Sequence, residues 1–199
     1  MDCAYCKRDA IYKCSTCGKL LCPGHTNLRT VCASCLMKTR FQHTIKKVSS
    51  EEERREIKKL VKRFWGEQEQ LTFDKSFKVA ELPAYVAKVR RSIIGFVTFV
   101  LTRGAVLIVA LGILPKYQGS GVGTGLVRKV EDEARRANKK RLHVSTSNDD
   151  LPALAFYQSL GFQIYEVKPN VIAEKHGEFQ KGIGRLPIRD ELRLQKYLA

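Results

Sequence analysis

Residues 111–127 read LGILPKYQGSGVGTGLV, and this stretch decides how the rest of the chain is interpreted. An apolar run leads into a loop containing Gly119, Gly121 and Gly123, and a second apolar-periodic run follows. Glycine-rich loops that open a helix bind phosphates, because glycine lets backbone N–H groups approach the ligand closely. A nucleoside-triphosphatase loop would need Lys-Ser or Lys-Thr after its last glycine, and neither follows Gly123. The stretch therefore predicts a phosphate site of another kind.

The segments around this loop alternate between helical and extended patterns. A helix is expected to begin after Ser49-Ser50, with acidic residues in its first turn, and to end at Gly66. The further elements expected are strands at 85–89, 93–101 and 105–114, a helix at 123–137, a strand at 141–146, a helix at 153–160, and strands at 162–167 and 188–197. This alternation predicts an α/β fold.

The stretch from Ile93 to Leu114 is long and apolar enough to raise the question of a membrane span. Arg103-Gly104 lies at its middle, where a lone arginine would be costly in a bilayer. Its β-branched residues and central turn favour two buried strands of a hairpin instead. The sequence therefore predicts no membrane partner.

Two motifs resemble the GNAT acetyltransferases over residues 50–199. LGILPKYQGSGVGTGLV is similar to the family's acetyl-CoA signature, and LPALAFYQSLGF at 151–162 is similar to its later helix-then-strand segment. The resemblance implies a mixed sheet flanked by helices, with a strand that splays from its neighbour to admit the cofactor. It also implies contacts between acetyl-CoA and Leu111, Gly112, Ile113, Gln118, Gly119, Ser120, Gly121, Val122, Gly123, Thr124, Asn148 and Tyr157.

The resemblance also implies the chemistry. An amine attacks the thioester, a backbone N–H near Ile113 stabilises the oxyanion, and Tyr157 acts as general acid towards the leaving thiolate. The family often has asparagine seven residues before this tyrosine; here that position is Asp150, and Asn148 lies two residues earlier. No cysteine follows Cys35, which favours direct transfer over a cysteine acyl-enzyme. The base stays open between a water chain and five side chains: Glu81, His143, Glu174, His176 and Glu178.

All seven cysteines of the chain lie between Cys3 and Cys35. Together with His25 they form four pairs, each with two residues between its members, which is the spacing that aims two side chains at one tetrahedral ion. Eight ligands fill two closed sites, so two structural Zn²⁺ ions are expected. The ligands are Cys3, Cys6, Cys14, Cys17, Cys22, His25, Cys32 and Cys35. Crowded thiols without an apolar signal-peptide core indicate a reducing, cytoplasmic compartment.

The spacing of these pairs resembles the B-box and HIT-type zinc fingers. The resemblance implies a cross-brace, in which the first and third pairs share one ion and the second and fourth pairs share the other. Pairing of neighbours along the sequence stays open. The expected organisation is a zinc-binding module at 1–38, a basic linker at 39–49 and a GNAT domain at 50–199.

The formal net charge of +16 suggests acidic partners. With an added zinc module, it favours a macromolecular acceptor: RNA or a protein associated with nucleic acid. The expected function is acetyl-CoA-dependent N-acetyl transfer to an amine of that acceptor. The alternatives are a non-catalytic zinc-finger protein that uses acetyl-CoA as a ligand or sensor, and a small-amine acetyltransferase. The resemblance implies that the glycine-containing connection at 168–186 lies beside the acceptor site, and two interpretations of it stay open: a clamp on the acceptor, or a solvated loop. The oligomeric state is left open.

Overall fold

A computed structural model describes residues 1–26, 30–38, 42–176 and 180–198. Its main body is a seven-stranded mixed sheet with the strand order β10-β13-β9-β8-β7-β6-β3. These strands are β3 (Thr44–Lys47), β6 (Ala84–Val89), β7 (Ser92–Leu101), β8 (Val106–Ile113), β9 (Arg141–Ser147), β10 (Gln163–Lys168) and β13 (Glu191–Tyr197). All neighbours pair antiparallel except β8 and β9, which are parallel. The mixed sheet flanked by helices is the fold expected from the sequence.

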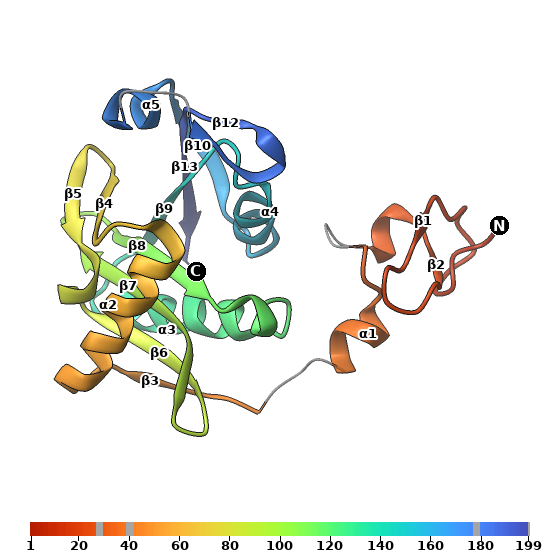
Figure 1. Cartoon of the computed structure of the whole chain (residues 1–199), viewed down its shortest axis with the longest axis horizontal. Coiled ribbons are helices and arrows are strands. Elements are labelled where there is room, and N and C mark those ends of the chain that lie inside the picture. The colour runs from red at the N-terminus through yellow and green to blue at the C-terminus, as the bar shows by residue number, and fades with distance from the viewer. Residues whose placement is uncertain (27–29, 39–41, 177–179, 199) are drawn as a thin grey trace.

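Helices cover both faces of this sheet (Figure 1). On one face α2 (Glu51–Trp65) packs Ile57 and Val61 against Phe96 of β7. On the other face α3 (Val122–Arg136) and α4 (Leu151–Ser159) bury a larger apolar cluster that includes Leu126 and Tyr157. The sheet is therefore the middle layer of three. The apolar clusters on its two faces hold β8 and β9 in place relative to the helices.

The helix α2 begins and ends where the sequence predicts. The Ser50 side chain accepts a hydrogen bond from the Glu53 backbone N–H (3.3 Å), and the Glu53 carboxylate accepts one from the Ser49 N–H (3.2 Å). This reciprocal pattern satisfies N–H groups that have no partner within the helix. At the other end Gly66 takes a left-handed φ of 78°, which glycine adopts without steric cost.

Several elements differ from the sequence prediction. Thr44–Lys47 forms the edge strand β3 on β6, so its interpretation as part of a linker is wrong; residues 39–41 lie outside the described ranges. The hairpin of β4 (Glu69–Thr72) and β5 (Lys75–Lys78) was not expected. The predicted strand at 188–197 begins only at Glu191, because Pro187–Ile188 (β12) pairs with Gln180–Lys181 (β11). The connection after β10 also contains a helix, α5 (Val171–His176).

The apolar stretch from Ile93 to Leu114 forms β7, a turn and β8. The Thr102 N–H donates to the Ala105 carbonyl (2.9 Å), and the Thr102 hydroxyl donates to the same carbonyl (2.8 Å), which closes the turn around Arg103-Gly104. This hairpin was the predicted arrangement. Among the helices in the described ranges, none is both long and apolar enough to cross a bilayer.

The N-terminal residues form a small unit of their own elements. These are β1 (Tyr12–Lys13), β2 (Leu20–Leu21), the 3-10 turn η1 (Pro23–His25) and α1 (Ala33–Lys38). The buried cluster of this unit consists of Leu21 and three cysteines, Cys14, Cys32 and Cys35. So small an apolar core cannot offset the conformational entropy of folding without an additional source of stability.

Candidate active site and candidate metal centre

The parallel strands β8 and β9 diverge halfway along their length. Their register runs only from Val106↔Leu142 to Ile108↔Val144, although β8 continues to Ile113 and β9 to Ser147. Val109 is the extra residue of a bulge against β7, because Ile108 pairs with Phe99 while Ala110 pairs with Thr98. A bulge bends the strand that carries it, which turns the upper half of β8 away from β9. The expected splay is present, and Leu111, Gly112 and Ile113 lie along it.

The glycine loop leads from β8 into α3 and presents a series of backbone N–H groups. Gly119 and Gly121 have left-handed φ values of 78° and 88°, and Gly121 is the N-cap of α3. The first N–H of this helix to find a backbone acceptor is that of Gly125, on the Gly121 carbonyl (3.0 Å). Within the described part of the chain, the N–H groups of residues 119–124 have no hydrogen-bond partner. Such a run at a helix N-terminus is an anion-binding nest.

Two side chains of this loop stabilise its conformation by hydrogen bonds to backbone carbonyls. The Ser120 hydroxyl is buried and donates to the Tyr117 carbonyl (2.5 Å). The Gln118 side-chain amide donates to the Ile113 carbonyl (3.0 Å). Both donors are thus engaged within the loop, and the main chain remains as the group that can bind a ligand. Val122, Gly123 and Thr124 supply the first turn of α3.

Tyr157 lies in the second half of α4 and is almost fully buried, at 5% exposure. Its ring packs edge-on against Phe156 and Phe162, with centroid distances of 5.2 and 5.5 Å. Burial, assisted by the nearby Asp150 charge, raises the pKa of Tyr157. The hydroxyl therefore stays protonated at neutral pH, as a general acid must.

A cavity of about 370 Å³ opens between the splayed strands and is lined by Tyr157. Its walls come from the end of α2, the β4–β5 hairpin, β8, β9, α4, α5 and the segment before β13. Among the described residues that line it, four are carboxylates, Glu67, Asp74, Asp150 and Glu191, and one is a cation, Lys175. The cavity is therefore acidic, although the chain as a whole carries a net charge of +16.

The hairpin is held over this cavity by a polar network. One oxygen of Glu191 accepts hydrogen bonds from the Thr72 hydroxyl (3.1 Å) and the Phe73 N–H (3.0 Å). Its other oxygen pairs with Arg193 (2.9 Å), which also pairs with Asp74 (2.9 Å) and lies over the Phe73 ring. The Thr72 and Ser145 hydroxyls lie 2.6 Å apart. These contacts fix the mouth of the cavity to β9 and β13.

Asn148 is engaged elsewhere, which argues against its predicted contact with the cofactor. Its side-chain carbonyl accepts hydrogen bonds from the Arg189 and Asp190 N–H groups (2.8 and 2.9 Å). Its amide donates to the Pro187 carbonyl (2.8 Å). The side chain thereby anchors the entry to β13. The neighbouring Asp150, in contrast, lines the cavity.

The five candidate bases from the sequence do not gather at this cavity. Glu81 and Glu174 are exposed and do not line it. His143 does not line it either, and its ring lies near those of Phe73 (5.8 Å) and Tyr165 (5.5 Å). Glu178 and the His176 side chain lie outside the described part of the structure.

Sequence reasoning missed Glu191 and the hairpin residue Thr72, which arrive from strands far apart along the chain. No local spacing could have connected them. Asp150 could have been found from the sequence, because it lies seven residues before Tyr157, where the family often has asparagine; Asn148 was chosen instead.

The cysteines and His25 gather into two groups of four. Cys3, Cys6, Cys22 and His25 form one group, and Cys14, Cys17, Cys32 and Cys35 form the other; within each, all ligand atoms lie within 4.8 Å of one another. This is the cross-brace arrangement, and no two neighbouring pairs along the sequence share a group.

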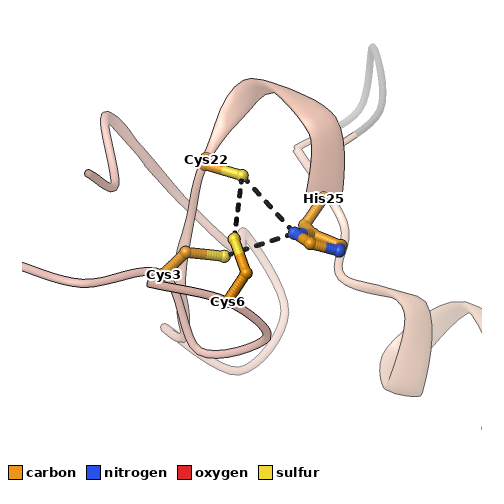
Figure 2. Close-up of side chains that lie close together, drawn as sticks. All are labelled: Cys3, Cys6, Cys22 and His25. Atoms are coloured by element: carbon orange, nitrogen blue, oxygen red, sulfur yellow. Dashed lines mark hydrogen bonds between the residues drawn. The ribbon is translucent and has the colours of Figure 1, made fainter. Parts of the chain in front are cut away.

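The distances within both groups suit a tetrahedral ion, and Figure 2 shows the group of Cys3, Cys6, Cys22 and His25. Cys6 Sγ and Cys22 Sγ lie 3.7 Å apart, and His25 Nδ1 lies 3.6 Å from Cys3 Sγ and 3.4 Å from Cys22 Sγ. In the second group Cys17 Sγ and Cys32 Sγ are also 3.7 Å apart. A zinc–sulfur bond of about 2.3 Å gives a tetrahedron whose edges are about 3.8 Å. The donor set and its spacing therefore fit Zn²⁺.

A backbone hydrogen bond favours the ionised form of Cys14, one of the buried ligands. The Cys32 N–H donates to Cys14 Sγ (3.3 Å), and this hydrogen bond lowers the pKa of Cys14 to about 6 despite burial. Thiolates are the form that binds metal.

Residues 49–162 match the model of the acetyltransferase (GNAT) family. The chain belongs to the GNAT family. This acetyltransferase is 32% identical to the uncharacterised protein YdhI of Bacillus subtilis over 141 residues, which cover 67% of this chain and 86% of YdhI. It is 47% identical to the N-alpha-acetyltransferase RimI of Mycobacterium tuberculosis over 53 residues, 27% of this chain and 32% of RimI.

The fold of this GNAT enzyme matches solved structures as well. A GNAT acetyltransferase from Elizabethkingia anophelis with acetyl-CoA bound superposes with a TM-score of 0.59, at 20% identity, over 80% of this chain and all of that one. This likeness shows the same mixed α/β fold, and the family match makes the chain an acetyltransferase.

Proposed function

We propose that this enzyme transfers an acetyl group directly from acetyl-CoA to an amine of a protein associated with nucleic acid, and that its N-terminal module recruits this acceptor. The observation that carries the proposal is the acidic cavity, which adjoins the splayed strands and Tyr157. Carboxylates attract a protonated amine and repel phosphates. Of the two macromolecular acceptors that the sequence suggested, the cavity therefore favours a protein amine over RNA. The similarity to RimI, an N-alpha-acetyltransferase, is in line with this choice.

The proposed binding of acetyl-CoA follows the geometry from the loop inwards. Backbone N–H groups of residues 119–124 hold the pyrophosphate at the positive end of α3. The unpaired edge of β8 from Leu111 to Ile113 binds the pantetheine arm, which enters between β8 and β9. The acceptor amine comes from the opposite side, through the cavity beneath the β4–β5 hairpin.

Transfer then needs three contributions from the chain. A backbone N–H near Ile113 stabilises the oxygen of the attacked thioester. Tyr157 donates its phenolic proton towards the leaving thiolate, and burial keeps that proton in place beforehand. The walls around Leu111 and Phe64 limit access of water to the thioester.

The N-terminal module would hold two Zn²⁺ ions in its two groups of ligands. The ions would supply folding free energy rather than a catalytic position, because both four-ligand sets are closed. Lys7, Arg8, Lys13 and Lys19 give this module a basic surface for a partner that carries nucleic acid.

Transfer of label from acetyl-CoA into a cell extract tests the proposal. The full zinc-loaded chain is incubated with extract, and the products are divided between ribonuclease and protease treatments. We expect the label to resist ribonuclease and to be released by protease. Label released by ribonuclease would assign the acceptor to RNA. Label in small molecules, or bound acetyl-CoA without transfer, would overturn the proposal in favour of a small-amine enzyme or a sensor.

A further inference from the structure

We infer that Asp150 is the proton acceptor of the transfer reaction, and this inference rests on the proposed function. In this role the carboxylate takes a proton from the ammonium group of the acceptor, so that the free amine can attack the thioester. No general base was assigned from the sequence, and the cavity contains a carboxylate whose surroundings suit this role.

The four carboxylates of the cavity differ in their partners. Glu67 pairs with Lys175 (3.0 Å), while Asp74 and Glu191 both pair with Arg193 (2.9 Å each). Asp150 accepts one hydrogen bond, from the Ala153 N–H to Oδ1 (3.0 Å). Across the described ranges, no cation lies within ion-pair distance of it. An ion pair stabilises the ionised form and makes a carboxylate a weaker base. Among the four carboxylates of this cavity, Asp150 is therefore the one that pairs with no cation in the described ranges.

Asp150 also lies where the acid–base chemistry takes place. It is the N-cap of α4, and Tyr157 follows seven residues later, about two turns along the same face. A helical tyrosine side chain points back towards the helix N-terminus, which brings the hydroxyl towards Asp150. The two groups influence each other, since the Asp150 charge contributes to the raised pKa of Tyr157. One helix thus presents a proton donor and a proton acceptor to one cavity.

The surroundings of Asp150 strengthen it as a base. Burial raises its pKa, the Ala153 N–H lowers it, and the charge of Asp149 raises it further. Glu191, Glu67 and Asp74 face the same cavity and add negative potential, which Arg193, paired with Asp74 and Glu191, and Lys175, paired with Glu67, partly offset. A carboxyl whose pKa moves towards neutrality accepts a proton from an amine more readily than an ordinary aspartate does.

The protons and bonds balance as follows. Asp150 removes one proton from the acceptor ammonium, and the amine nitrogen forms a bond to the thioester carbon. The carbon–sulfur bond then breaks, and the thiolate takes the Tyr157 proton. The amine nitrogen then gives its second proton to the Tyr157 phenolate, which restores the phenol. Asp150 returns its own proton to solvent. The products are the amide and the free thiol.

Asp150→Asn tests the inference, because asparagine caps a helix as well as aspartate does and cannot accept the proton. Asp132→Asn is the matched control, since it makes the same change at an aspartate of α3 that does not line the cavity and whose side chain is 43% exposed. Initial rates are measured from pH 6 to 9 with labelled acetyl-CoA and acid-extracted total ribosomal protein as the acceptor pool. For Asp150→Asn we expect kcat to fall about a hundredfold at pH 7. The KM for acetyl-CoA should stay unchanged, and the residual rate should rise as pH increases the free-amine fraction. Asp132→Asn should keep the wild-type profile.

Three results would overturn the inference. One is a wild-type kcat in Asp150→Asn. Another is an increased KM for acetyl-CoA at constant kcat, which would make Asp150 a cofactor contact. The third is a loss of kcat with an unchanged pH profile, which would indicate a structural effect. Failure of the wild-type enzyme to label the pool while it binds acetyl-CoA would instead overturn the proposed function, and the inference with it.

Discussion

Gly121 offers a direct test of how the glycine loop holds the pyrophosphate. Its φ of 88° is left-handed, and a Cβ at this position would meet no atom of the protein within 4 Å. Gly66 at the end of α2 has the same two properties, with a φ of 78° and open space around its Cβ. Alanine at either position therefore introduces the same backbone strain, about 1–2 kcal/mol for a left-handed L-residue. The two substitutions differ only in what lies outside the protein at each site.

We expect Gly66→Ala and Gly121→Ala to lower the Tm by a similar amount. A loss of about 1 kcal/mol lowers the Tm by about 2–4 °C for a chain of 150–250 residues, so each variant should melt about 2–8 °C below wild type. Only Gly121→Ala should weaken acetyl-CoA binding. One hydrogen bond to a charged group contributes about 1.5–3 kcal/mol, so loss of one N–H contact to the pyrophosphate raises the Kd about 10- to 150-fold.

Calorimetry gives both quantities on the same samples: the Tm from thermal scans and the Kd from titration with coenzyme A. Equal Kd values for Gly121→Ala and wild type would refute the assignment of the pyrophosphate to this loop. Equal weakening in Gly66→Ala would show that strain, and not the closeness of the backbone to the ligand, controls the affinity.

Three further predictions concern other parts of the chain. Tyr157→Phe should lower kcat about a hundredfold with little change in the KM for acetyl-CoA; because burial raises the pKa of Tyr157, wild-type kcat should show no alkaline decline up to about pH 10. Chelation should release two Zn²⁺ per chain, measured with a colorimetric indicator, and should make residues 1–26 susceptible to protease while the main body keeps its Tm; release of one ion or none would contradict the two-site arrangement. Burial raises the pKa of Glu53, but ion pairs with Lys46 (2.6 Å) and Lys88 (2.7 Å) and the hydrogen bond from the Ser49 N–H outweigh it and bring the pKa to about 2. Its stabilising contribution is present above pH 4.5 and is lost as the pH falls towards 2, so Glu53→Gln should remove about 2–3 kcal/mol of stability at pH 7 and flatten the acid limb in urea titrations.

The centre of the fold could be predicted because its sequence patterns are local. The apolar strand before Pro115, the glycines and the periodic residues of α3 lie next to one another, so periodicity and turn chemistry identify the strand–loop–helix unit without tertiary information. The metal ligands are similar, since spacing of two residues within each pair is a local property. The way the pairs combine is not local, and it came from resemblance.

The elements that were missed depend on distant contacts. In β3 only Ile45 turns inward, so a strand of Thr-Ile-Lys-Lys reads as a polar linker. The β4–β5 hairpin turns through Phe73 and Asp74, both with positive φ (52° and 60°) and without the glycine that usually marks such a turn. Stacking of Phe73 on His143 and its contact with Arg193 offset the strain of that turn. The sequence alone gives no indication of those partners.

The same limitation applies to the cavity. Its carboxylates come from the end of α2, the hairpin turn, the start of α4 and the start of β13. Their convergence depends on the register of β13 with β9, in which Glu191 lies opposite Ser147. A one-residue slip would turn Glu191 to the other face of the sheet. Acid–base roles within the cavity could therefore be assigned only after the strands were placed.

The divergence of β8 and β9 links the stability of the enzyme to its substrate supply. Above Ile108 the two strands have no ladder between them, so their upper halves lack the mutual hydrogen bonds that protect the rest of the sheet. A molecule that fills this gap binds the folded state alone. At a free concentration of one hundred times its Kd, it adds about 2.7 kcal/mol to the free energy of unfolding. Amide exchange in residues 109–113 and 145–147 should slow accordingly as coenzyme A is added. The fraction of enzyme that is folded and protected from proteolysis would then follow the concentration of the acetyl donor.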